Sequence, residues 1–380
     1  MSNPFTITRR TFLTGLGAGL AVKALGCGTR PETNPGPDAE AKPDFRIDRR
    51  FRLSSYLTAD LTVYKNRILG VVTPSLSVSG GGDTANYLFE FDPNDPSPAP
   101  STTQIDLPDG LWLSQVVLLP SERRVVTAHS GFYVEDASQP QGRRPVLFPP
   151  EYNIVGGAVA TSNKLLIAAS SAVLGSDNWL RFNSGGVFIY DLDSNGDVQE
   201  SPRRFVATSG ANPTGLVLRR NSSELVVLNS GGFVDRREPS LNIIDLQGER
   251  ITNTTPLPSG TTAQVSPRLA LFPDEKIAIV GTTDGTGRVF FIDLENGRLL
   301  LESELSGTRF HSSVQADEDF VYVGDFDSEQ LPILDWGGNL LTDDDLQFGF
   351  SKAGPSILLG GKLYQSLPNE IVVISRGMPG

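Results

Sequence analysis

The sequence predicts an all-β protein built from one repeated unit, and three observations support this expectation. Gly and Pro are frequent, with 39 and 27 among the 380 residues, which is unfavourable for long helices. From Asp44 onward, short apolar or alternating runs end at Gly, Pro, Asn or Asp about every eight to twelve residues. Several of these runs share one ending, in which apolar residues are followed by Asp and a turn: residues 87–92, 187–191, 242–245, 289–293 and 332–335.

The spacing of these endings predicts seven units. The interval from Asp92 to Asp191 is close to twice the later intervals, so we expect a degenerate unit between them, with its ending at residues 145–148. Residues 371–375 repeat the ending once more, with Ser375 in the place of Asp. Each ending follows two apolar runs that are joined by a short polar turn. A unit of four strands in about 40 to 50 residues is typical of a β-propeller blade.

The two ends of the repeat predict how the ring closes. Five residues follow Ser375, which is too few for a fourth strand in the last blade, whereas residues 45–54 form a spare strand before the first unit. We therefore expect residues 44–380 to form a seven-bladed β-propeller with four-stranded blades, closed by the N-terminal strand. Such closure removes the exposed sheet edges that invite aggregation. A pair of β-sandwiches, the competing architecture, gives no reason for sevenfold spacing.

The units resemble bacterial YVTN-type propeller repeats, in which Gly-x-x-Pro often precedes the first strand of a blade and Asp ends the third. The residues that carry the resemblance are Gly210-Ala-Asn-Pro213-Thr-Gly215 and Ile243-Ile-Asp245-Leu246. The resemblance covers residues 50–376 and is strongest over 205–308, although no unit has an intact YVTN run. It implies a propeller fold. Because its relatives range from surface-binding proteins to lactonases, it implies no single activity.

The first 27 residues are typical of a twin-arginine export signal. Arg9 and Arg10 precede Phe-Leu and a moderately apolar run over residues 13–25. This run would be about 20 Å long as a helix, shorter than the roughly 30 Å hydrocarbon core of a membrane. These dimensions favour a signal segment over a spanning helix. We therefore expect an exported protein, located in the periplasm or at the outer cell surface.

The signal ends at Cys27, the single cysteine of the chain. Ala24-Leu-Gly-Cys27 resembles a bacterial lipobox, which implies a lipidated Cys27 and a membrane anchor, because two or more acyl chains bind a bilayer stably. Ala24 and Gly26 also suit an ordinary small-x-small cleavage, which is the alternative. Residues 28–43 are rich in Pro, Gly and charge, and we expect them to form a disordered tether between the anchor and the propeller.

Composition excludes several classes of function. The formal net charge of −12 argues against a nucleic-acid partner, which requires clustered Lys and Arg. One Cys and two His cannot build a structural zinc site, and no haem-attachment motif occurs. We expect a monomer that binds no cofactor. The alternative is a protein that binds a calcium ion. Asp191, Asp193 and Asn195 resemble the start of a calcium loop, but Pro202 stands at its twelfth position, and Asn-Gly by itself favours a hairpin turn.

In a propeller, the loops between the second and third strands of the blades open on one face, where ligands commonly bind. The sequence predicts long loops in the first four blades, over residues 73–86, 129–144, 170–186 and 229–240, and short ones in the last three. The candidate ligand-binding residues in the long loops are Arg143, Arg144, Trp179, Arg181, Arg236 and Arg237. These Arg side chains suit a carboxylate or phosphate and Trp179 suits a flat ligand. The simpler interpretation is solvated loop charges that pair with neighbouring acids.

His129 and His311 are weak catalytic candidates. Both are expected near this face, but no nucleophile motif accompanies either of them. The sequence therefore favours a non-catalytic propeller of the cell envelope, which binds a protein, peptide or glycan through the long loops of blades 1–4. The alternative is a propeller hydrolase of the lactonase kind that uses the central depression, and only the resemblance implies that activity.

Overall fold

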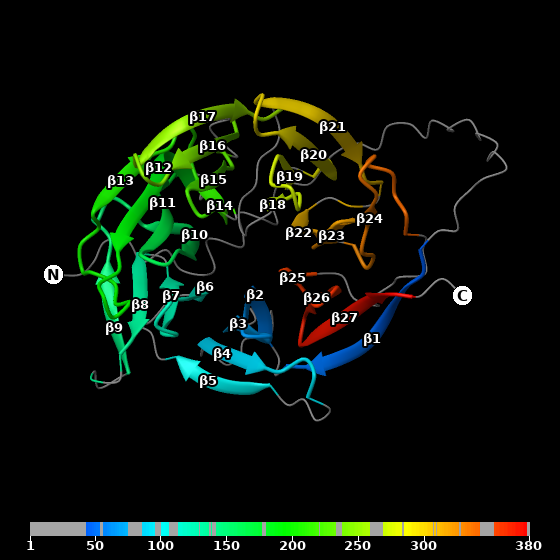
Figure 1. The fold of residues 1–380 in the computed structure, drawn as a ribbon, viewed down its shortest axis with the longest axis horizontal. Coiled ribbons are helices and arrows are strands. Elements are labelled where there is room, and N and C mark those ends of the chain that lie inside the picture. The colour runs from blue at the N-terminus through cyan, green and yellow to red at the C-terminus, as the bar shows by residue number, and fades with distance from the viewer. Residues whose placement is uncertain are drawn as a thin grey trace.

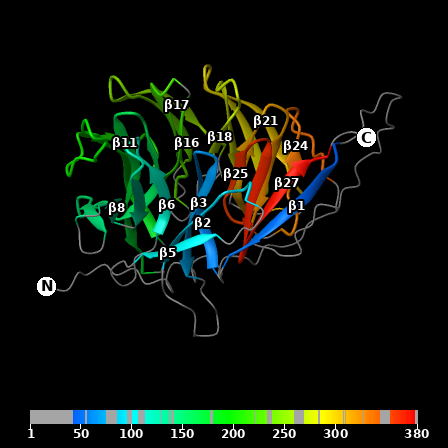
Figure 2. The ribbon, with the colours of Figure 1, turned by 60° about the horizontal axis from the view of Figure 1, so that its bottom comes forward.

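The computed structural model is a ring of β-sheets that succeed one another in chain order (Figure 1 and Figure 2). Every regular element of its described residues is a β-strand, which confirms the predicted all-β class. No helix among these residues is long and apolar enough to cross a membrane. The signal residues Arg9 and Arg10, the lipidation candidate Cys27 and residues 28–42 of the tether lie outside the described residues. The described residues are 43–53, 56–74, 86–95, 100–105, 113–128, 130–136, 138, 142–176, 180–219, 221–232, 238–258, 269–282, 285–306, 308, 310–326, 328–342 and 353–377.

The strands form seven sheets, and each sheet is one blade whose strands are called A to D from the centre of the ring outward. Blade 1 contains β2 (Tyr56–Tyr64), β3 (Arg67–Pro74), β4 (Asn86–Phe91) and β5 (Ser101–Ile105). Blade 2 contains β6 (Leu113–Leu118), β7 (Arg124–Ala128), β8 (Gly131–Glu135) and β9 (Arg143–Leu147). Blade 3 contains β10 (Ile154–Ala160), β11 (Lys164–Leu174), β12 (Leu180–Asp191) and β13 (Arg204–Ala207).

The remaining four blades complete the ring. Blade 4 contains β14 (Pro213–Leu218), β15 (Glu224–Asn229), β16 (Ser240–Asp245) and β17 (Arg250–Pro256). Blade 5 contains β18 (Leu269–Leu271), β19 (Ile277–Gly281), β20 (Arg288–Asp293) and β21 (Arg298–Glu304). Blade 6 contains β22 (His311–Ala316), β23 (Val321–Asp325) and β24 (Ile333–Leu334). Blade 7 contains β25 (Ser356–Leu359), β26 (Lys362–Leu367), β27 (Glu370–Arg376) and β1 (Phe45–Arg52). The prediction of seven blades is confirmed.

The ring closes through its N-terminal strand, as predicted. β1 pairs antiparallel with β27, from Phe45 opposite Arg376 to Arg52 opposite Glu370. The strand is also held by its side chains, because Phe51 is 1% exposed and lies 4.6 Å from Phe91 of blade 1, measured between ring centroids. The last blade is therefore made of both ends of the repeat, so the ring cannot open without breaking this sheet.

Blade 6 is the least regular blade. Its described residues form three named strands, and the place of strand D is marked by a single bridge between Leu334 and Leu340. A backbone hydrogen bond of 2.8 Å from Leu341 N to Ile333 O continues this pairing. The outer part of the blade therefore follows the four-stranded plan with less pairing.

The repeated Asp at the end of strand C has a structural role. Asp245 accepts hydrogen bonds from Gln247 N at 3.0 Å and Gly248 N at 3.1 Å. Asp293 accepts the equivalent hydrogen bonds from Glu295 N at 2.9 Å and Asn296 N at 3.0 Å. A carboxylate that satisfies the backbone N–H groups of a turn fixes the chain reversal that leads into strand D. The sequence signal that revealed the repeat is therefore a turn signal and not a ligand site.

Blade 2 corrects the prediction in one respect. The expected strand C at residues 145–148 is instead strand D, β9 (Arg143–Leu147), and strand C is β8 (Gly131–Glu135). Glu135 takes the place of the usual Asp and accepts a hydrogen bond from Arg124 N at 3.2 Å. Only two residues thus separate strand B from strand C, and the long segment of this blade lies between C and D.

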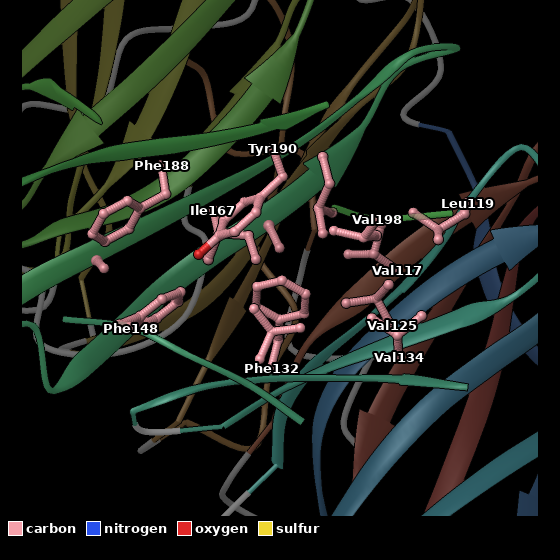
Figure 3. Close-up of a cluster of buried hydrophobic side chains, with 14 residues drawn as sticks. Val117, Leu119, Val125, Phe132, Val134, Phe148, Ile167, Phe188, Tyr190 and Val198 are labelled. Atoms are coloured by element: carbon pink, nitrogen blue, oxygen red, sulfur yellow. The ribbon is translucent and has the colours of Figure 1, made fainter. Parts of the chain in front are cut away.

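Aromatic side chains fill the space between blades 2 and 3 (Figure 3). Phe132 meets Tyr190 edge to face, with ring centroids 5.0 Å apart, and Phe148 stacks on Phe188 at the same separation. Tyr190 is completely buried, and its hydroxyl has no hydrogen-bond partner among the described residues. Burial raises the pKa of this hydroxyl. Such packing of sheet against sheet supplies most of the attraction between neighbouring blades.

The A strands form the inner wall of the ring, and each contacts the A strands of both neighbours. A β-bulge in several of them turns the next side chain toward the following blade. Gln115 Oε1 accepts a hydrogen bond from Ala158 N at 2.5 Å, and Ser356 Oγ donates to Ser313 Oγ at 2.9 Å. These bonds set the relative height of adjacent blades and hence the shape of both mouths of the ring.

Candidate functional site

The ring has two faces that a ligand can approach. The B–C face is the end at which strand B of each blade turns into strand C, and the A–B face is the opposite end, at which A turns into B and C into D. Seven large apolar side chains of the described residues are exposed. Four of them lie toward the B–C face: Leu147, Val173, Leu174 and Phe326. Exposed apolar side chains gathered at one end of a fold mark a candidate interaction surface.

A β-ribbon of blade 3 dominates the B–C face. β11 and β12 pair continuously up to Leu174 and Leu180, whereas their outer neighbours stop earlier, β10 at Ile154 opposite Ser170 and β13 at Ala207 opposite Gly186. The end of the hairpin therefore extends past the blade by about four residue pairs, or about 13 Å. The predicted loop over residues 170–186 is thus largely strand, with its turn outside the described residues.

The base of the ribbon is fixed to the body of the blade. Asn153 uses both ends of its amide, because Nδ2 donates to Ala172 O at 2.8 Å and Oδ1 accepts from Ala172 N at 2.9 Å. Ala172 and Phe182 pack on Ala211, which belongs to the segment entering blade 4. An isolated two-stranded hairpin is barely stable in water, so this bracing gives the ribbon a defined direction.

Beyond this base the ribbon carries apolar side chains into solvent. Val173 is 43% exposed and Leu174 is 40% exposed. Arg181 lies directly opposite Val173 in the ladder, so its side chain stands on the same face of the ribbon. Of the predicted binding residues, Arg181 is the one that the structure places on the B–C face.

Arg143 and Arg144 do not lie where the sequence predicted them. Both belong to β9, the outer strand of blade 2, at the end that pairs with Glu135 and thus toward the A–B face. Arg144 donates a hydrogen bond to Val198 O of blade 3 at 2.8 Å and lies 3.6 Å from the Glu200 carboxylate. Their role as B–C loop residues is therefore wrong, because the long segment of blade 2 connects C to D.

The other predicted binding residues cannot be placed in the same way. Trp179, Arg236 and Arg237 lie outside the described residues, as does the weak catalytic candidate His129. The connection of blade 4 that carries Arg236 and Arg237 runs between Asn229 and Ser240, as the sequence predicted. Arg143 and Arg144 cannot share a ligand with Arg181, because they lie toward the opposite face of the ring.

His311, the second catalytic candidate, is part of the interior. Its exposed fraction is 0%, and Nε2 lies 3.1 Å from the Thr308 hydroxyl. It pairs in the ladder with Asp325, whose carboxylate accepts hydrogen bonds from Phe310 N at 2.8 Å and Ser328 N at 2.7 Å. These contacts join strands A and B of blade 6 and keep the imidazole away from solvent, so a substrate cannot reach it in this conformation.

The candidate calcium ligands lie in an ordinary hairpin turn. Asp193 Oδ1 accepts hydrogen bonds from Asn195 N at 2.8 Å and Asp197 N at 2.9 Å, and Gly196 has the positive φ of 76° that the turn needs. Asp191 lies 3.4 Å from the Arg203 guanidinium. Among the described residues, no group of three or more His, Cys, Asp and Glu side chains is arranged to hold a metal ion.

A cavity that the sequence did not predict opens at the A–B face, near the centre of the ring. It has a volume of about 410 Å³ and is lined by the ends of the A strands and the following turns in blades 4 to 6, and by blade 7. Its lining residues are Val217, Leu218, Leu271, Phe272, Pro273, Glu275, Ala316, Asp317, Glu318 and Leu358. The polar turns after these strands are visible in the sequence, but their meeting at one mouth depends on the ring.

Two contacts fix the walls of this cavity. The Trp336 ring stands edge-on to Phe272, with ring centroids 3.7 Å apart, and its Nε1 donates to Glu318 O at 3.0 Å. Asp317 accepts hydrogen bonds from Phe320 N at 2.8 Å and from the Tyr322 hydroxyl at 2.7 Å. Burial, followed by the Asp317 contact, raises the pKa of the Tyr322 hydroxyl. Trp336 thus links the walls contributed by blades 5 and 6.

Comparison with known proteins supports the fold and goes no further. No family model matches the chain, and no curated protein matches it. The chain is similar to the solved Dos1 propeller, with a TM-score of 0.60 at 12% identity over 87% of this chain and 95% of that one. It is also similar to the WD40 β-propeller domain of Doa1, with a TM-score of 0.55 at 11% identity over 87% of this chain and 97% of that one. At such identities the likeness shows the β-propeller fold alone.

Proposed function

We propose that this protein is a cell-envelope propeller, held at a membrane by a lipid on Cys27, that binds a protein or peptide ligand through its B–C face. The observation that carries the proposal is the braced ribbon of blade 3. Beyond the contact between Asn153 and Ala172, the ribbon exposes Val173 and Leu174 to solvent. Exposed apolar side chains on a rigidly held element mark an interaction surface. The apolar character of Val173 and Leu174 favours a polypeptide over a glycan.

The position of the N-terminal strand supports an outward orientation of this surface. β1 starts at Phe45 opposite Arg376, the last residue of β27, so the chain enters blade 7 at the A–B face. There Phe45 lies 5.2 Å from Phe320, measured between ring centroids, in the A–B turn of blade 6. A tether of residues 28–43 spans at most about 50 Å and typically about 20 Å. An anchor at Cys27 would therefore hold the A–B face toward the membrane and leave the ribbon pointing away.

Site-specific crosslinking in the native envelope tests this proposal. A photoreactive amino acid is placed at Val173 in one variant and at Leu299 in the other. Leu299 is an equally exposed residue, 43% in each case, on the outer strand β21. We expect discrete adducts with a polypeptide at position 173 only, and their loss when Leu174→Asp is added. The same adducts at both positions, or none at position 173, would contradict a docking role for the ribbon.

The hydrolase alternative is not carried by a specific observation. His311 is inaccessible in this conformation, and the cavity at the A–B face is lined by carboxylates and apolar groups with no His, Ser or Cys among its residues. The B–C face of the described residues therefore supports binding better than catalysis.

A further inference from the structure

The cavity at the A–B face combines two features that point to one class of ligand. One part of its wall is apolar and the other carries three carboxylates, those of Glu275, Asp317 and Glu318. We propose that this cavity binds a small organic cation, an amine or guanidine carried on an apolar body. This inference is independent of the ligand proposed for the B–C face, because the two surfaces lie at opposite ends of the ring.

The charge of the wall selects a cation. The lining contains no Lys, Arg or His, and among the described residues no basic side chain forms an ion pair with Asp317 or Glu318. The neighbouring Asp319 does have such a partner, Arg376, at 2.9 Å. Two backbone N–H groups and the Tyr322 hydroxyl donate to Asp317, and these hydrogen bonds hold its carboxylate in place at the wall. A cationic ligand would therefore meet the carboxylates of Asp317 and Glu318, with which no described basic side chain forms an ion pair.

The remaining wall selects an apolar body of limited size. Val217, Leu271, Ala316 and Leu358 are only partly buried, so their faces at the cavity gain from being covered. Phe272 is held in place by the edge-on contact with Trp336. The volume of about 410 Å³ lies at the lower end of the range typical of small-molecule pockets. A large or flexible polypeptide would not fit inside it.

Fluorescence of Trp336 tests the proposal directly, because this ring touches the wall of the cavity. The other two tryptophans, Trp112 and Trp179, are replaced by Phe, and the protein is titrated with phenethylamine, 2-phenylethanol and 3-phenylpropanoate. We expect a saturable signal with the amine alone. The amine should bind several-fold more weakly when the ionic strength is raised from about 0.1 M to about 1 M, because the Debye length falls from about 10 Å to about 3 Å. Equal binding of the neutral alcohol, or no binding of the amine, would overturn the proposal.

Two sets of variants locate the binding. Glu275→Gln combined with Glu318→Gln should weaken phenethylamine binding about tenfold, since each exposed charge pair contributes a few-fold in affinity. Glu304→Gln, which removes an exposed carboxylate on β21 outside the cavity, is the matched control and should leave binding unchanged. Both proteins should unfold at the same temperature as the parent, because the three side chains are not buried. Equal affinity of the double variant and the parent would show that the cavity is not the site.

Discussion

Asp60 of blade 1 accepts a hydrogen bond from Val116 N of blade 2 at 3.3 Å, across the inner wall of the ring. Its side chain is 5% exposed, and its hydrogen-bond donors are backbone N–H groups. Burial raises the pKa of this carboxyl to about 8. The equivalent residue of blade 2 is Gln115, which makes the same kind of bond without a titrating group. The hydrogen bond that Asp60 makes between blades 1 and 2 therefore depends on pH, whereas the bond that Gln115 makes between blades 2 and 3 has no titrating acceptor.

Asp60→Asn should remove part of the pH dependence of stability. A folded-state pKa near 8 lies above the unfolded value, so the folded protein holds the proton more tightly. The contribution of Asp60 to stability is fully present below about pH 4 and is lost as pH rises toward about 8, by at most about 1.4 kcal/mol per pH unit. Asn keeps the acceptor without the charge. Urea unfolding of parent and variant at pH 5, 7 and 9 should therefore show a growing advantage of the variant.

The control for this prediction is Gln115→Glu, which places a titrating carboxyl at the equivalent position of blade 2. This variant should acquire a pH dependence of the same sign. A difference between Asp60→Asn and the parent that is identical at all three pH values would contradict a raised pKa for Asp60.

Tyr190→Phe should leave the protein equally stable or make it more stable by about 1 kcal/mol. The Tyr190 hydroxyl is buried and finds no hydrogen-bond partner in the part of the chain that the structure describes, and such a group costs about 1–3 kcal/mol of desolvation. Phe keeps the ring contacts with Phe132 and Phe188. Thermal unfolding measures the effect. Tyr322→Phe is the contrasting variant, because it loses the hydrogen bond to Asp317 and should destabilise. Equal losses in both variants would show that Tyr190 has a partner in solution.

Phe51→Ala should destabilise the closure of the ring by about 3–5 kcal/mol, since it removes a buried aromatic ring. Phe51 belongs to the N-terminal strand and contacts Phe91 in the next blade. Arg46→Ala on the same strand is the control, because Arg46 is exposed and its ion pair with Asp48 is a surface one. Denaturant midpoints measure both effects. Similar small losses in the two variants would mean that the N-terminal strand contributes little to closure.

Repetition made the fold predictable, because the Asp at the end of strand C and the paired apolar runs recur wherever a blade forms. Blade 2 was misread for the same reason, since Glu135 replaces the Asp that marks strand C. Ser, Gly, Asp and Asn over residues 170–186 are typical of a loop, whereas the hairpin ladder and the contact with Asn153 make residues 170–174 and 180–186 strand. Sequence reasoning could not find the cavity, because the turns that line it become neighbours only when the ring closes.

Cys27→Ser should release the protein from the membrane fraction of its native envelope. A thioether-linked lipid requires the sulfur of this residue, and Ser provides no substitute. Cys27 is the single cysteine of the chain, so the substitution affects no disulfide. Thr29→Ala, two residues further on, is the matched control and should remain with the membrane. Mass spectrometry of the N-terminal peptide should show acyl chains on the parent protein and none on the variant. A parent protein that is soluble and carries no acyl chains would refute the lipid anchor and favour simple cleavage near Gly26.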